Sequence, residues 1–130
     1  MLIQRLSAMP ISNIYLFADK LSEKLYNLDT RVHAHYCSKN EPDNFISVDS
    51  FLYARCATIA EGKLHYKTVL NDASKMPNDI EFEPLLFLAD RAFKLKTRKD
   101  FNYRPVFNYE THANKIRLEV KWHSPAWKFN

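Results

Sequence analysis

Residues 115–123, Lys-Ile-Arg-Leu-Glu-Val-Lys-Trp-His, decide the fold class that the sequence predicts. Apolar side chains at every second position alternate with mostly charged ones, which is the period of a strand with one buried face. Residues 101–109 carry a similar pattern, and Pro105 favours an edge position for that strand. Residues 110–114 would close the pair as a C-terminal β-hairpin. The apolar faces of the two predicted strands comprise Phe101, Tyr103, Phe107, Tyr109, Ile116, Leu118, Val120 and Trp122.

Three helices are predicted upstream of this hairpin. Apolar residues recur at three- and four-residue steps over residues 13–28, which is the spacing of an amphipathic helix. A second helix begins at Ser47 or Asp49 and ends at Gly62, which suits a left-handed C-terminal cap. A third helix covers about residues 84–95, because proline is favoured in a first helical turn.

Two further strands are predicted between the helices, at residues 31–37 and 64–70, where apolar and polar side chains alternate. The element order is then α-β-α-β-α-β-β. This order predicts a single α+β domain over residues 1–130, with helices packed on one face of a small, mostly antiparallel sheet that ends in the hairpin.

The chain contains one glycine, Gly62, where average usage would give roughly nine. Glycine-rich phosphate loops, dinucleotide-binding turns and nucleophile elbows therefore cannot be built, and no cofactor is predicted. Cys37 and Cys56 have neither a metal-binding nor a redox spacing. With no apolar run of membrane length, the sequence predicts a reduced, cytoplasmic protein without a membrane partner.

Charge is distributed unevenly along the chain. From residue 91 to residue 130, ten lysines and arginines face three acidic residues, whereas residues 1–90 have a net charge of −3. Such asymmetry is typical of a surface that binds an anionic macromolecule, either nucleic acid or an acidic protein. The predicted binding residues are Lys94, Lys96, Arg98, Lys99, Arg104, Lys115, Arg117, Lys121 and His123.

A zinc site is an alternative at His33, His35 and Cys37, which a strand would project to one side. Cys56 or His65 would be the fourth ligand. His33-Ala34-His35 also resembles the His-hydrophobic-His element of the HUH endonucleases, and residues 36–39, Tyr-Cys-Ser-Lys, are similar to their Tyr-x-x-Lys element. In a strand, however, the tyrosine would point away from a metal held by the histidines.

Glu119-Val120-Lys121 resembles the (D/E)-x-K half of the PD-(D/E)xK nucleases. The resemblance implies a divalent cation between Glu119 and an upstream aspartate, with Lys121 near the attacked phosphate. Asp100 is the nearest upstream aspartate. In the predicted hairpin it lies about five residues too far along the strand to meet Glu119.

We interpret the sequence as that of a small non-catalytic binding protein that engages an anionic partner through the basic hairpin. Glycine-poor single domains of this kind suit stoichiometric inhibitors and immunity-type proteins of mobile elements. The alternative is a metal-dependent nuclease that uses either His33, His35 and Cys37 or Glu119 and Lys121. A third hypothesis is a homo-oligomer in which the aromatic C-terminus, with Trp127 and Phe129, inserts into a neighbouring copy.

Overall fold

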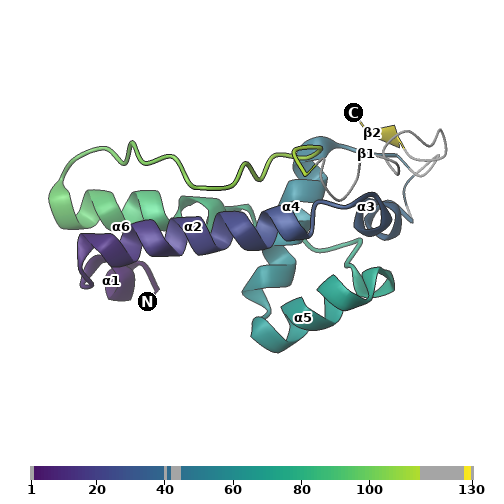
Figure 1. Ribbon diagram of the computed structural model, residues 1–130, viewed down its shortest axis with the longest axis horizontal. Helices are drawn as coiled ribbons and strands as arrows, with labels where there is room; N and C mark the ends of the chain where they lie inside the picture. Colours follow the sequence, from purple (N-terminus) through teal and green to yellow (C-terminus); the bar gives the residue numbers. More distant parts are fainter. Residues whose placement is uncertain (1, 40, 42–44, 115–127, 130) are drawn as a thin grey trace.

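The computed structural model describes residues 2–39, 41, 45–114 and 128–129, and these residues are mainly helical (Figure 1). Within them, β1 and β2 pair in parallel over two residues each, Phe45 with Lys128 and Ile46 with Phe129. The elements are α1 (Leu2–Ser7), α2 (Ile11–Asn27), α3 (Arg31–Cys37), β1 (Phe45–Ile46), α4 (Val48–Ala60), α5 (Lys63–Asn71), the 3-10 helices η2 (Ala73–Lys75) and η3 (Glu83–Phe87), α6 (Leu88–Thr97) and β2 (Lys128–Phe129).

This architecture overturns the predicted α+β fold. The β1–β2 pair is the whole of the strand pairing among the described residues, so the small antiparallel sheet is wrong. The C-terminal hairpin is also wrong, because residues 101–109 form no strand. Its second strand, residues 115–123, falls outside the described residues. β2 lies next to β1, so the end of the described chain meets a segment far from the predicted hairpin partner.

Helix α2 confirms the predicted first helix and organises the fold. It begins at Ile11, two residues before the predicted start, and Pro10 precedes it with no side-chain cap hydrogen bond. The predicted apolar face is inward, because its residues are buried apart from the half-buried Phe17. The buried members of that face are Ile14, Ala18, Leu21, Leu25 and, just beyond the helix, Leu28.

Helix α4 confirms the second predicted helix and its first cap. The Ser47 hydroxyl accepts a hydrogen bond of 3.0 Å from the backbone N–H of Ser50. The helix is buried around most of its circumference rather than along one face, as expected of a central element. Gly62 follows the C-cap with φ 111° and ψ 168°. That positive φ requires glycine, although the conformation is not the left-handed helical one predicted.

The predicted strand at residues 31–37 is instead α3. Thr30 caps this helix, since its hydroxyl accepts a 3.0 Å hydrogen bond from the backbone N–H of His33. Burial then recurs at Arg31, Ala34 and Cys37, three residues apart. A window of seven residues satisfies both a period of 2 and a period near 3.6, and the threonine cap is the local signal that favours the helix.

The predicted strand at residues 64–70 is likewise a helix, α5, which begins directly after Gly62. Tyr66 and Val69 are its buried residues, again three apart, whereas Leu64 is 81% exposed. Gly62 therefore separates two helices instead of a helix and a strand. The third predicted helix is confirmed in outline, because Pro84 lies in the first turn of η3 and α6 continues to Thr97.

Residues 101–114, which we call the strap, run along α2 in an extended conformation (Figure 1). Odd-numbered residues from Phe101 to Tyr109 are half-buried and the even-numbered ones are exposed. The predicted alternation is therefore correct, but the strap packs on a helix. In a sheet, a neighbouring strand would accept hydrogen bonds from the strap backbone. Here side chains of α2 accept them instead.

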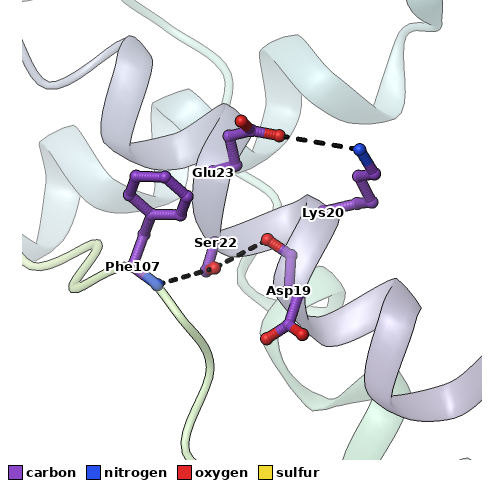
Figure 2. A network of polar contacts seen from close by, with 5 residues as sticks. All are labelled: Asp19, Lys20, Ser22, Glu23 and Phe107. Carbon is purple, nitrogen blue, oxygen red and sulfur yellow. Dashed lines mark hydrogen bonds and ion pairs between the residues drawn. The ribbon is translucent and has the colours of Figure 1, made fainter. Parts of the chain in front are cut away.

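Asp19 and Ser22 hold the middle of the strap. The Asp19 carboxylate accepts hydrogen bonds from the Tyr103 hydroxyl at 2.7 Å and from the backbone N–H of Val106 at 2.9 Å. Figure 2 shows the Ser22 hydroxyl, which accepts from the backbone N–H of Phe107 at 3.3 Å and donates to the Asp19 carbonyl oxygen at 2.7 Å. The bond to Asp19, together with burial, raises the pKa of Tyr103.

The apolar core consists of three clusters joined by α2 and α4. One lies between α1, α2 and α6, and a second between α2, α4 and η3. The third fills the space between α3, α4 and α5, with Phe51 and Val69 fully buried. Phe101 and Tyr103 pack against the first cluster and Tyr109 against the second, so the strap completes both.

A buried arginine connects the strap to this core. Arg55 of α4 is fully buried, and its Nη1 donates 2.9 Å hydrogen bonds to the carbonyl oxygens of Leu25 and Tyr109. Its Nη2 donates to the Thr111 hydroxyl at 3.1 Å. Burial lowers the pKa of Arg55, and the negative charge of Asp29 opposes that shift.

Asp29 receives the end of the strap. Its carboxylate is fully buried and accepts from the backbone N–H groups of His112 at 3.2 Å and Asn114 at 3.0 Å. The Asn114 side chain also donates to the Tyr26 carbonyl oxygen at 2.7 Å. Arg55 and Asp29 thus satisfy strap groups that a hairpin partner would otherwise have satisfied.

Replacing Asp19 by alanine removes the two carboxylate oxygens that accept hydrogen bonds from Tyr103 and Val106 in the middle of the strap. We expect several-fold faster proteolytic cleavage within residues 101–110, because local opening becomes easier there. Glu23→Ala is the matched control, since within the described ranges Glu23 contributes only an exposed ion pair, with Lys20 at 3.9 Å (Figure 2). Equal cleavage rates in the two variants would contradict the assigned role of Asp19.

Replacing Arg55 by methionine is expected to lower the free energy of unfolding by about 3–5 kcal/mol, because the carbonyl oxygens of Leu25 and Tyr109 lose a charged donor and Asp29 loses a nearby positive charge. Adding Asp29→Asn should recover none of that loss, because an amide NH₂ would replace one of the two carboxylate oxygens that accept backbone N–H groups at the end of the strap. Urea unfolding measures both values. Arg91→Met, at an exposed arginine of α6, is the control and should change stability by about 0.5 kcal/mol or less. A loss in Arg55→Met no larger than in this control would show that the guanidinium does not hold the strap.

Candidate functional site

The end of α6 and the start of the strap carry a cluster of exposed cations, at the end of the molecule where α1 also lies (Figure 1). Residues 91–104 include six lysines and arginines against the single carboxylate of Asp100. None of these cations forms an ion pair within the described part of the chain. We call the predicted members of this cluster the basic surface: Lys94, Lys96, Arg98, Lys99 and Arg104.

The helix spreads these cations over more than one side. Lys94 shares a face of α6 with Arg91, which was not among the predicted binding residues, and Arg98 follows the helix as its C-cap. Lys96 lies on a different side, where its ammonium donates to the Ser7 carbonyl oxygen at 3.3 Å. The basic surface therefore extends from α6 towards α1.

Arg98 closes α6 in an uncommon backbone conformation. Its φ is 63° and ψ 20°, in the left-handed region, and its backbone N–H donates to the Lys94 carbonyl oxygen at 2.8 Å. Glycine is the usual residue at such a helix end, because a side chain is disfavoured there by about 1–2 kcal/mol. Arginine therefore occupies a position where glycine would make the fold more stable.

The aromatic residues beside the basic surface face inward. Tyr15 stacks on Tyr103 with ring centroids 4.5 Å apart, and Phe93 and Phe101 lie 5.2 Å apart. Phe101 and Tyr103 are half-buried in these contacts. Their inward placement agrees with the predicted apolar face, and they offer no free ring on which a base could stack.

The other predicted cations, Lys115, Arg117, Lys121 and His123, lie outside the described residues. So do Glu119 of the nuclease hypothesis and Trp127 of the oligomer hypothesis. These hypotheses remain predictions.

The zinc hypothesis loses its geometric premise. On helix α3, successive steps of about 100° place His33 and His35 on opposite sides instead of one. His33 is buried, its Nε2 donates to the Val69 carbonyl oxygen at 2.7 Å, and its Nδ1 meets the Thr30 hydroxyl. No group of three or more His, Cys, Asp or Glu side chains in the described ranges is arranged to hold a metal ion. His33 is better explained as a core histidine that joins α3 to α5.

A polar cavity of about 570 Å³ lies beside β1. Carboxylates of Glu41, Asp79 and Glu81 line it, and Cys37 borders it. Burial, followed by the charge of Glu81, raises the pKa of the Cys37 thiol to about 12. Burial raises the pKa of the Cys56 thiol to about 12 as well. Both cysteines are therefore neutral thiols near pH 7, which is unsuitable for a nucleophile.

Comparison with known proteins identifies a family for the helical part. A family model described as a protein of unknown function, DUF4240, matches residues 1–95. The chain belongs to this family. The residues that match DUF4240 run from α1 through most of α6, so Lys96, Arg98, Lys99 and Arg104 of the basic surface come after them. No curated protein and no solved structure matches the chain.

None of the helices in the described ranges has the length and apolar character that crossing a bilayer requires.

Replacing Arg98 by glycine should raise the free energy of unfolding by about 0.5–1 kcal/mol, because relief of the left-handed conformation exceeds the entropy that glycine adds to the unfolded chain. Thermal unfolding monitored by circular dichroism measures the change. Arg104→Gly is the matched control, since Arg104 is exposed without a positive φ. A destabilisation of Arg98→Gly equal to that of Arg104→Gly would contradict the assigned strain.

Proposed function

We propose that this DUF4240 protein is a non-catalytic binding protein that engages an acidic protein through the basic surface. The observation that supports this proposal is the set of exposed cations at the end of α6, which have no ion-pair partner within the described residues. Clusters of this kind steer association with an oppositely charged partner and set its orientation.

The side-chain chemistry of the described core supports binding rather than catalysis. The Cys37 and Cys56 thiols have pKa values raised to about 12, and both ring nitrogens of His33 are engaged in the core. His33 and Cys37 were predicted metal ligands in one form of the nuclease alternative, whereas Glu119 and Lys121 of the other form lie outside the described residues. Two buried free thiols also suit a reducing compartment, so we propose the cytoplasm.

An acidic protein fits the basic surface better than single-stranded nucleic acid does. Single-stranded binding combines phosphate contacts with aromatic stacking, and the rings of Phe101 and Tyr103 are turned into the core. Docking onto one acidic partner would also suit a stoichiometric inhibitor of the immunity type, which acts without turnover.

Charge reversal tests this proposal. The triple variant Lys94→Glu, Arg98→Glu, Lys99→Glu should bind fluorescently labelled polyglutamate at least about tenfold more weakly than the unaltered chain, measured by anisotropy at low and at physiological salt. The control carries Lys63→Glu, Lys67→Glu and Lys75→Glu, three exposed lysines on α5 and η2, and should retain binding.

Labelled duplex DNA and single-stranded RNA serve as competing probes in the same assay. Tighter binding of either nucleic acid, lost in the α6 variant, would replace the acidic protein by nucleic acid as the partner. Equal affinity of both charge-reversal variants for polyglutamate would contradict the proposal that the basic surface binds the acidic partner.

A further inference from the structure

An apolar groove lies between α1 and α2, away from the strap. It encloses about 450 Å³, and α1 and the turn after it contribute Leu2, Leu6 and Met9 to its lining. From α2 come Leu16 and Phe17. Leu6 is buried at its base, whereas Leu2 is 51%, Met9 41% and Leu16 55% exposed. Apolar side chains gathered in a hollow with polar groups at its border are a common feature of interaction surfaces.

The three faces of α2 account for this groove. Ile14, Ala18 and Leu21 face the core, while Asp19 and Ser22 hold the strap. The remaining face, from Asn13 to Lys20, is covered neither by the core nor by the strap. A helix with two occupied faces and an apolar third face resembles one that lacks a packing partner.

Charge at the border of the groove limits what can occupy it. Arg5 of α1 and Lys20 of α2 are the charged residues of its lining, and no carboxylate belongs to that lining. Lys20 has one exposed ion pair, with Glu23 at 3.9 Å, which is weak enough to exchange for a better partner (Figure 2). The groove therefore combines an apolar floor with a positive border.

We propose that this groove binds an amphipathic, acidic helical segment of a partner protein. Apolar side chains of that segment would lie on Leu6, Met9 and Leu16, and its carboxylates would pair with Arg5 and Lys20. In helix-in-groove recognition the bound helix presents apolar anchors at three- and four-residue spacing. Leu2, Leu6 and Met9 offer apolar contacts to such anchors along one wall, and Leu16 and Phe17 offer them on the other. A symmetric contact with a second copy would instead bring the same cations together, so charge favours a different protein.

This inference does not depend on the basic surface at the end of α6. The groove is built from α1 and α2, within the residues that match the family, whereas most of the basic surface follows them. Either surface can be altered while the other is retained.

A labelled helical peptide of about 15 residues, with leucines along one face and glutamates beside them, is the probe. We expect it to bind the whole chain, and Leu16→Gln to weaken that binding about tenfold through lost apolar burial. Leu64→Gln is the matched control, because Leu64 is 81% exposed on α5 and remote from the groove. Thermal unfolding of both variants verifies that each remains folded.

Charge is tested separately from apolar contact. Arg5→Gln with Lys20→Gln should weaken binding of the glutamate peptide but not of its glutamine counterpart, and a lysine counterpart should bind poorly. Binding of the lysine and glutamate peptides with equal affinity would overturn the acidic occupant.

Three further results would contradict the groove as the binding site of an acidic helix from a partner protein. The first is equal affinity of Leu16→Gln and Leu64→Gln for the peptide. The second is peptide binding that the α6 charge-reversal variant loses and Leu16→Gln keeps, which would leave the basic surface as the site and the proposed function intact. The third is a dimer of the unaltered chain that Leu16→Gln converts to a monomer, measured by light scattering, which would make a second copy the occupant.

Discussion

The buried guanidinium of Arg55 joins parts of the chain that are far apart in sequence. It bonds to the end of α2 through Leu25 and to the strap through Tyr109 and Thr111. Asp29 offsets its charge and binds the strap backbone at His112 and Asn114. Buried charges are stable only when they are compensated and hydrogen-bonded, so each partner requires the others. The end of the strap, the core cluster against which Tyr109 packs and the end of α2 all meet at this arrangement.

The strap shows how a strand-like sequence is satisfied without a sheet. Its alternating side chains bury one edge of the segment against α2 and α6, as they would in a hairpin. An extended backbone still needs hydrogen-bond partners, and here Asp19, Ser22 and Asp29 provide several of them from a helix and its C-terminal end. The period of 2 therefore reports an extended chain with one buried edge, whatever surface covers that edge.

The strap also divides the surface of α2 and so determines where a partner can bind. By covering one side of the helix, it leaves the basic surface beyond α6 and the apolar groove beside α1 as separate exposed regions. The first is rich in charge and poor in free aromatic rings, and the second is apolar with two cations at its border. Both chemistries suit an acidic protein. Neither depends on a nucleophile or on a group of metal ligands.

The sequence by itself determined α2, α4 and α6, because each is long enough for its apolar period to be unambiguous, and it located the exposed cations at the end of α6. It also indicated which side of residues 101–109 is buried. It did not determine that residues 31–37 and 64–70 are helical, since seven residues fit both periods and only the Thr30 cap and Gly62 favour a helix. Only the tertiary structure decided what the strap packs against. Its backbone acceptors, Asp19 and Asp29, lie more than 80 residues away along the chain, and no local pattern reports a contact at that separation.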